Sequence, residues 1–300
     1  MDESPTVFLP PRRRGLLLHI GLGLVLAAVS AAAVFLAMRT AVGAYFVLLM
    51  LLALLLMGPL ALVIYRGYAL TQAAYTLERD GLRLRWGLRS EDIPLNAVEW
   101  VRPVTELGTA LPTPPLSMPG AILGTRRVEG LGPVEFMASE PDDLILLAVP
   151  ARIFAISPAD PRAFTRSFQR AIELGSLSPL APRSARPAAY LQSTWDYRAV
   201  RILILTGAAL SLALFVVTSL IIPTRAAIPL GFDAAGQPLE PGPSARLLLL
   251  PILGALVYLT DLVGGLYFFR KLPARPVAYV LWASGAVTVL LLLVSLIFVM

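Results

Sequence analysis

Five uninterrupted apolar runs, each long enough to cross a lipid bilayer, constrain this chain more than any other feature. A hydrocarbon core of about 30 Å takes about 20 residues of helix to cross. The chain is 57% hydrophobic and only 15% charged, which is far too apolar for an ordinary soluble domain. We therefore expect five transmembrane helices in an integral membrane protein. They lie roughly at residues 15–38, 41–65, 202–222, 247–269 and 277–298.

The placement of cations predicts the orientation of these spans. One set of span ends carries Arg12, Arg13, Arg14, Arg66, Arg198, Arg201, Arg270, Lys271 and Arg275. The opposite set carries only Arg39, Arg225 and Arg246. Cations near span ends concentrate on the cytoplasmic side, so we expect a cytoplasmic N-terminus and an outer C-terminus. Because many of the basic residues flank the apolar spans, the net charge of +6 does not indicate a nucleic-acid partner.

The residue types present argue against most catalytic chemistry. The chain has no cysteine, which excludes disulfides, thiolate metal sites and thiol nucleophiles. Its single histidine, His19, lies inside the first apolar run, so a histidine metal site would need a second chain. We expect neither a metal nor another cofactor, and we expect that the protein is not an enzyme.

Between the second and third runs the hydrophobic pattern changes to that of a water-facing sheet. Leu82, Leu84 and Trp86 alternate with Arg83 and Arg85 after an Asp80-Gly81 turn, which predicts an antiparallel hairpin. Further strands are expected from residue 97, from residue 132 and, as a hairpin broken near proline 150, from residue 144. A helix follows, with Asp160 as its N-cap, Phe164, Phe168 and Ile172 on one stripe, and Gly175 at its end.

This order of strands and helix resembles the pleckstrin homology superfold, and bacterial membrane-attached PH-like domains in particular. The resemblance covers about residues 75–175 and is carried by "YTLERDGLRLRWG", by the "G-x-G-x-V" hairpin at residues 130–134, by Ser139 and by "ISPADPRAF" at residues 156–164. It implies a bent antiparallel sheet or barrel closed by a C-terminal helix, acting as a non-catalytic binding module. The fold class expected is an α+β protein of a bacterial plasma membrane, with two spans before the inserted cytoplasmic domain and three after it.

Two surfaces of this insert are candidate binding sites. Arg79, Arg83 and Arg85 imitate the basic pattern with which eukaryotic relatives hold phosphoinositide headgroups, but Glu78, Asp80 and Glu91 interrupt it, and a solvated strand face is the simpler interpretation. The second surface is the uncharged, proline-rich segment 107–123. It either contacts lipid headgroups or the chain's own helices, or it merely covers a sheet edge.

The expected domain boundaries follow from these observations. Residues 1–14 form a cytoplasmic N-terminus, 15–65 a transmembrane hairpin, 66–178 the PH-like domain, 179–200 a linker, and 201–300 a three-helix transmembrane domain with an outer loop at 223–246. Limited order is expected for residues 176–190, which are rich in proline, serine, alanine and arginine. That loop loosely resembles small bacterial membrane proteins of unknown function related to toxin-immunity proteins, through Ile228, Pro229, Phe232, Gly236 and Pro238. Gly231 replaces the histidine of that pattern, so any role of the histidine is lost.

Asp261 and His19 are the ionisable groups expected inside the membrane. Such groups are costly in lipid and are functional candidates by default. The leading hypothesis is a membrane protein whose PH-like module recognises a protein partner or lipid, with homo-oligomerisation as a further possibility. In it Asp261 makes a structural hydrogen bond with His19, Tyr258 or a serine or threonine. The alternative is a small transporter or channel subunit that uses Asp261 and is regulated by the PH-like domain.

Overall fold

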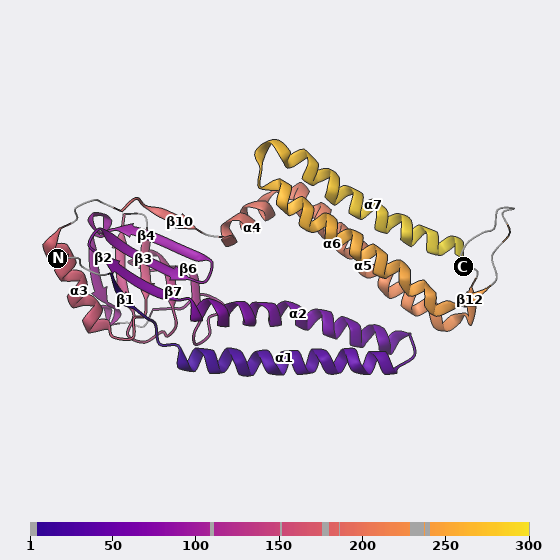
Figure 1. The fold of residues 1–300 in the computed structure, drawn as a ribbon, viewed down its shortest axis with the longest axis horizontal. Helices are drawn as coiled ribbons and strands as arrows, with labels where there is room; N and C mark the ends of the chain where they lie inside the picture. Colours follow the sequence, from indigo (N-terminus) through magenta and orange to yellow (C-terminus); the bar gives the residue numbers. More distant parts are fainter. Residues whose placement is uncertain are drawn as a thin grey trace. The chain divides into compact units, whose positions relative to one another are not determined.

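The computed structural model describes residues 5–108, 111–150, 152–175, 180–185, 187–228, 237 and 241–299 (Figure 1). The chain divides into two compact units. One comprises Met1–Ala28 and Met57–Pro187, and the other comprises Val29–Leu56 and Ala188–Met300.

Among the described residues, five helices are long and apolar enough to cross a membrane, as the sequence predicts. They are α1 (Arg13–Arg39), α2 (Ala44–Thr71), α5 (Arg198–Ile221), α6 (Leu249–Phe269) and α7 (Arg275–Val299). Leucine, isoleucine and valine side chains are widely exposed along all five, which suits helices surrounded by acyl chains. Helix α2 continues through Pro59 and passes almost directly into the first strand of the inserted domain.

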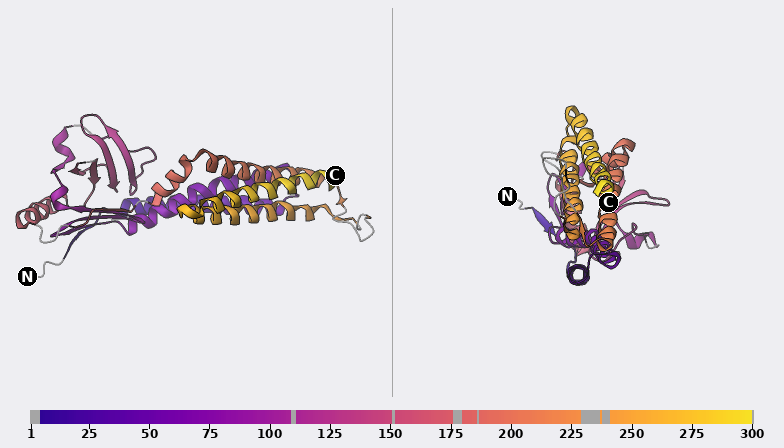
Figure 2. Two further views of the ribbon diagram at one scale, coloured as in Figure 1. Left: turned by 90° about the horizontal axis from the view of Figure 1, so that it is seen from above. Right: turned by 90° about the vertical axis from the view of Figure 1, so that its right-hand side faces the viewer.

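The inserted segment, together with β1 from before α1 and β10 from after the insert, forms two five-stranded sheets that lie in separate layers (Figure 2). This part of the structure is called the β-domain. The first sheet has the order β1 (Thr6–Phe8), β2 (Ala74–Glu78), β3 (Gly81–Trp86), β4 (Arg89–Pro94) and β10 (Arg183–Ala185). The second has the order β5 (Trp100–Pro103), β8 (Ile145–Val149), β9 (Arg152–Ile156), β7 (Gly132–Ala138) and β6 (Ile122–Val128). The β-domain also contains α3 (Pro161–Leu174). Further along the chain lie α4 (Pro187–Asp196) and the short strands β11 (Ala227–Ile228) and β12 (Gly242–Pro243).

The predicted first hairpin is confirmed. Strands β2 and β3 pair antiparallel around Asp80-Gly81, and Leu82, Leu84 and Trp86 are buried on the inner face of the sheet. The sequence analysis missed the next strand, β4, because "RSEDIP" contains one apolar residue other than proline and so shows no clear alternation. Pairing with β3 places Glu91 opposite Leu84 and Ile93 opposite Leu82, so β4 has an inner face that carries charge.

The second sheet is buried on both faces, which explains the unbroken apolar sequence of β8. Ile145, Leu147, Phe154 and Ile156 face the first sheet and α3, in a core that also holds the side chains of β3. The opposite face belongs to a second apolar cluster, which includes Phe136, Leu144, Leu146 and Ala148. A strand covered on both sides reads as a continuous apolar run rather than an alternating one. The expected closure of the sheets into a barrel stays a prediction.

Helix α3 closes one end of the space between the sheets. The Asp160 side chain accepts a hydrogen bond of 2.8 Å from the backbone N–H of Ala163, as a helix N-cap does. Phe164 and Phe168 are buried as predicted, but the third expected member of that stripe, Ile172, is 52% exposed. Ala171 is buried instead, because the helix turns by 3.6 residues rather than 4 per turn and the contact drifts by one position.

Segments outside the insert cover both edges of the first sheet. Strand β1 lies within the predicted N-terminal segment 1–14, and it pairs antiparallel with β2. Strand β10 lies within the predicted linker 179–200, and it pairs with β4 over three residues. The described part of that linker also contains α4, so the limited order predicted for residues 176–190 is corrected from Pro187 onward. Covering the edges removes exposed backbone groups that would otherwise pair with other chains.

Tyr75 ties the two sheets together through its buried hydroxyl group. The hydroxyl donates to the carbonyl oxygen of Met137 in β7 over 2.6 Å and accepts from the N–H of Ser157 over 3.3 Å. Burial raises the pKa of Tyr75 well above its usual value near 10. The neutral form is therefore the one compatible with the fold.

Tyr75→Phe should lower the free energy of unfolding of the β-domain by about 1 to 2 kcal/mol, because two buried backbone groups lose a partner. The substitution should also flatten the pH profile above about pH 10, where the unfolded tyrosine ionises but the folded one does not, so the wild type loses stability as the pH rises. Denaturant unfolding of the full-length protein in detergent, followed by circular dichroism at neutral pH and at about pH 9 to 11, measures both effects. Exposed Tyr68→Phe is the control, and an equal effect at Tyr68 would contradict the assignment.

Candidate recognition cleft

At the end of the intersheet space away from α3, charged side chains replace apolar ones. In β4 the residues Arg89, Glu91 and Ile93 alternate onto the inner face, and in β7 and β9 the inward positions include Glu135 and Arg152. Glu91 and Glu135 are almost fully buried, at 4% and 3% exposure. Buried carboxylates are costly unless cations compensate them. The neighbouring arginines supply that compensation.

The contacts form one connected network. Arg89 bridges the two sheets, because its guanidinium contacts both Glu91 and Glu135. Nη1 of Arg152 donates to the other carboxylate oxygen of Glu135 over 2.9 Å. Among the residues that the structure describes, two arginines therefore contact the two buried glutamates. Sequence reasoning missed it, although a glutamate between Val134 and Phe136 in an otherwise apolar strand was the available signal.

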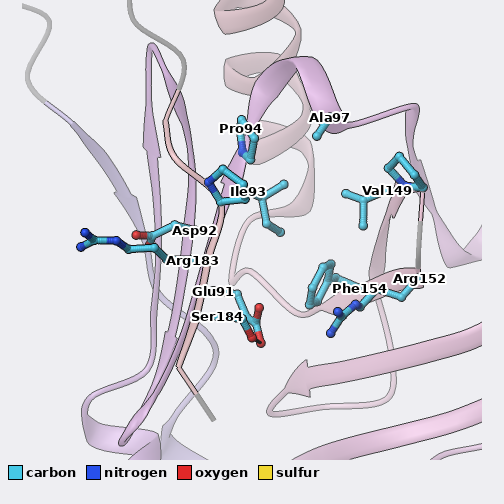
Figure 3. A pocket seen from close by; sticks show the side chains of 12 residues that line it. Glu91, Asp92, Ile93, Pro94, Ala97, Val149, Arg152, Phe154, Arg183 and Ser184 are labelled. Carbon is cyan, nitrogen blue, oxygen red and sulfur yellow. Dashed lines mark hydrogen bonds between the residues drawn. The ribbon is translucent and has the colours of Figure 1, made fainter.

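A cleft of about 280 Å³ opens beside this network (Figure 3). Its apolar lining includes Ile93, Pro94, Ala97, Val149 and Phe154, and its polar lining includes Glu91, Asp92, Arg152, Arg183 and Ser184. In Figure 3 the side chains of Glu91 and Ser184 lie together, whereas Asp92 and Arg183 extend to the other side of the strand pair. Few convergent polar groups on an apolar wall are typical of binding sites.

One rim of the cleft is an added strand. Ser184 of β10 pairs with Glu91 of β4 in the antiparallel ladder, and its hydroxyl donates to Oε1 of Glu91 over 2.8 Å. The three residues of β10 are all exposed. Backbone pairing with β4 and the hydroxyl contact of Ser184 are among the contacts that attach this strand.

The three arginines predicted to bind a ligand do not converge on one site. Arg79 donates through Nε and Nη2 to the carbonyl oxygens of Gly175 and Leu174, at the C-terminus of α3. Arg83 lies 3.3 Å from the carboxylate of Glu78 and 4.0 Å from that of Asp92. Arg85 is exposed on the outer face of β3. Ligand binding by these residues stays a prediction.

The uncharged segment 107–123 packs on the chain's own helices in its described part. The carbonyl oxygen of Leu116 accepts a hydrogen bond of 2.8 Å from Nη1 of Arg66 in α2. Gly120 approaches the backbone of Gly15 in α1 so closely that a Cβ on Gly120 would lie 2.5 Å from the Cα of Gly15. Of the alternatives considered from the sequence, contact with the helical hairpin therefore accounts for this part of the segment.

The two ionisable groups within the apolar helices have local partners. Nδ1 of His19 is 2.7 Å from the carbonyl oxygen of Gly15, so Nδ1 carries the donated hydrogen. Ser284 in α7 donates to Oδ2 of Asp261 over 3.1 Å, and Tyr258 donates to the carbonyl oxygen of Ile204 instead. Of the partners considered for Asp261, serine is the one found. A role in transport stays a prediction.

Asp261→Asn should preserve most of the stability of the helical unit, because an amide oxygen can accept the same hydrogen bond. Asp261→Leu should cost about 1 kcal/mol, because the hydrogen bond between α6 and α7 is lost while the Ser284 hydroxyl keeps the carbonyl oxygen of Leu281 as an acceptor. Denaturation in detergent, combined with Ser284→Ala in a double-mutant cycle, measures the coupling. Loss of activity in a stable Asp261→Asn protein would instead favour proton or ion transfer.

The toxin-immunity resemblance of the outer loop stays a prediction. Pro229, Gly231, Phe232, Gly236 and Pro238 lie outside the described residues. Ile228 is described: it is buried and belongs to β11, which pairs with β12.

Comparison with known proteins identifies the β-domain. Residues 73–172 match the family model of the bacterial PH domain. This range begins just before β2 and ends within α3, so it contains nearly all the strands of both sheets but neither β1 nor β10. No curated protein and no solved structure matches the chain.

Proposed function

We propose that this chain, whose residues 73–172 are a bacterial PH domain, is a membrane protein that recognises an extended segment of a partner protein in the cleft beside β4. The PH domain acts as a non-catalytic binding module, and the apolar helices hold it at the bilayer. The observation that carries the proposal is the pairing of β10 with the edge of β4.

Strand addition offers affinity through the backbone and specificity through side-chain pockets. Strand β10 pairs with Ser90, Glu91 and Asp92, which are half of the six residues of β4. The cleft beside this edge provides an apolar wall from Ile93, Val149 and Phe154. A partner strand that replaced β10 would gain the same backbone bonds and could place alternate side chains against that wall.

The distribution of arginines supports protein over headgroup recognition. Binding a phosphorylated headgroup needs several cations directed at one point. Arg79 is engaged with the end of α3, and Arg83 lies between two carboxylates. Only weak, salt-sensitive attraction to anionic lipid is then expected from the first hairpin. Tight, headgroup-selective binding that Arg83→Ala plus Arg85→Ala removed would overturn this preference.

Site-specific photocrosslinking in native membranes tests the proposal. A photoreactive residue at Ala97 or Val149, both in the cleft lining, should capture one protein through an extended segment that mass spectrometry can map. The same residue at Glu129, on the exposed turn between β6 and β7, is the control. Crosslinks to lipid only, or equal crosslinking at Glu129, would refute recognition of a protein in the cleft.

A strand-breaking variant separates the two possible roles of β10. Ser184→Pro removes a backbone N–H and a hydroxyl group, and so weakens the pairing with β4. If β10 occupies the place of the partner strand, this variant should increase crosslinking from Ala97. A decrease would mean that β10 is a permanent wall of the cleft, and strand addition at this edge would be abandoned.

The proposed orientation places the PH domain in the cytoplasm and the C-terminus outside. Arg66 and Arg198 flank the segment that contains the domain, and Arg12 to Arg14 lie at the start of α1, which is the cation excess expected on the cytoplasmic side. Reporter fusions test this as a prediction: a reporter active only outside the cytoplasm should be silent at Ser178 and active at Met300. The reverse pattern would overturn the topology.

A further inference from the structure

Two leucines on loops of the PH domain are unusually exposed. Leu88 lies in the two-residue turn between β3 and β4 and is 60% exposed, and Leu116 in segment 107–123 is 78% exposed. Single exposed leucines are ordinary on protein surfaces. These two are informative because both lie on loops that contact α2, and because Leu116 has a left-handed backbone conformation.

The backbone of Leu116 adopts a left-handed conformation, with φ of 61°. Residues with a side chain avoid this region because the Cβ approaches the following carbonyl oxygen. Arg66 donates to the carbonyl oxygen of Leu116 itself, and Ser117 donates through its hydroxyl to Pro114. The loop thus holds a large apolar side chain outward in a conformation that glycine would adopt more easily. Strain of this kind is typical of contact sites.

Both loops lie against the end of α2. A Cβ on Gly87, the residue before Leu88, would lie 2.7 Å from the Cβ of Ala69 and 3.3 Å from the hydroxyl oxygen of Tyr65. The Leu116 loop reaches the same helix through Arg66. The two loops that carry these leucines therefore both contact α2 within residues 65–69.

This level of α2 corresponds to a membrane interface. The apolar run of α2 ends at Tyr65, and Arg66 is the first charged residue of the helix. Tyr65 and Tyr68 are both exposed here. Tyrosines and arginines at the end of an apolar helix mark the depth at which headgroups meet acyl chains. Segment 107–123 carries no charge that would oppose contact with that layer.

We propose that Leu88 and Leu116 insert into the acyl–headgroup boundary of the bilayer that α1 and α2 cross. The PH domain is then held to the lipid surface at two points in addition to its covalent link to α2. We assign lipid as the contact of both leucines because both loops pack on α2 where its apolar run ends. At that depth a membrane helix passes from acyl chains to headgroups. This inference does not depend on the identity of any protein partner.

Single-cysteine labelling of the full-length protein tests the proposal, and the natural absence of cysteine makes each label unique. Leu88→Cys and Leu116→Cys proteins carry an environment-sensitive fluorophore and are reconstituted into phosphatidylcholine–phosphatidylglycerol vesicles. Leu62→Cys, on an exposed position of α2, is the membrane control. Ile172→Cys is the aqueous control: it is 52% exposed near the end of α3 that Arg79 contacts, at the opposite end of β2 from α2.

Labels at positions 88 and 116 should show blue-shifted emission, quenching by lipids with nitroxide groups high on the acyl chain, and protection from aqueous iodide. The label at 172 should show the reverse. Iodide access at 88 and 116 equal to that at 172 would overturn the proposal. So would blue-shifted emission without quenching by the nitroxide lipids, which would indicate contact with protein, including a second copy of the chain. The vesicles contain no partner protein, so failure here leaves the cleft proposal untouched.

Discussion

Replacing Glu135 by alanine is expected to lower the free energy of unfolding of the PH domain by about 3 kcal/mol, because Arg89 and Arg152 then lose their shared carboxylate. Both arginines belong to strands of the domain core, and Glu135 is only 3% exposed. Removal of one partner from a buried network leaves uncompensated charge in a region of low dielectric constant. Partial exposure of the two arginines keeps the expected loss near the lower end of the range for such pairs.

Native-state hydrogen exchange of the full-length protein in detergent measures this loss at the amides of β7 and β9. Glu129→Ala is the matched control, since it removes an exposed glutamate from the turn of the same hairpin and should change stability by less than about 0.5 kcal/mol. Glu135→Gln should fall between the two, because it keeps the shape and one acceptor. Equal stability of Glu135→Ala and the control would show that water compensates the arginines.

Gly120→Ala is expected to cost about 2 to 4 kcal/mol and to loosen the contact between the PH domain and its own transmembrane hairpin. The new Cβ would lie 2.5 Å from the Cα of Gly15 and 2.9 Å from Cδ2 of Leu70. The leucine can rotate away, but the backbone of α1 cannot move without displacing the helix. A left-handed φ of 85° adds backbone strain for any residue with a side chain.

Gly130→Ala provides the control that separates crowding from strain. Gly130 has a similar φ of 78°, but no atom lies within 4 Å of the position that its Cβ would take. Its substitution should cost only the backbone strain, about 1 kcal/mol. Limited proteolysis of the segment around Gly120 in the full-length protein, together with unfolding in urea, distinguishes the two variants. Equal losses would mean that the close approach to α1 contributes nothing.

The strands and helices that follow one simple rule were predictable. Leu82, Leu84 and Trp86 alternate with arginines, which predicts a strand. Asp160 as N-cap and the apolar stripe that starts at Phe164 predict α3. Strands β4 and β10 were not predicted. Their side chains are mostly polar, and they are strands because neighbours offer backbone groups to pair with. The hydrophobic pattern of a strand does not indicate which neighbouring strand its backbone pairs with.

The binding residues show the same division. Arg79 and Arg83 stood out in the sequence as part of a basic pattern, but their partners come from α3 and from β4. Glu135 and Arg152 are 17 positions apart, and Glu135 is 46 positions from Arg89. Only the packing of one sheet on another brings them into one network.

By itself, the sequence determined that the chain has five membrane-length helices and a sheet domain inserted after the second, because helix length and period-two alternation are local properties. Its residues 73–172 also carry the motifs of the bacterial PH domain, whose family model matches that range. The tertiary structure decided which strands complete the sheets, where the buried charges meet and which face of segment 107–123 touches α1 and α2. Those features depend on contacts between residues distant in the chain. Such contacts are stabilised by exclusion of water from apolar surfaces and by hydrogen bonds and ion pairs between distant segments, which no local stretch of sequence specifies.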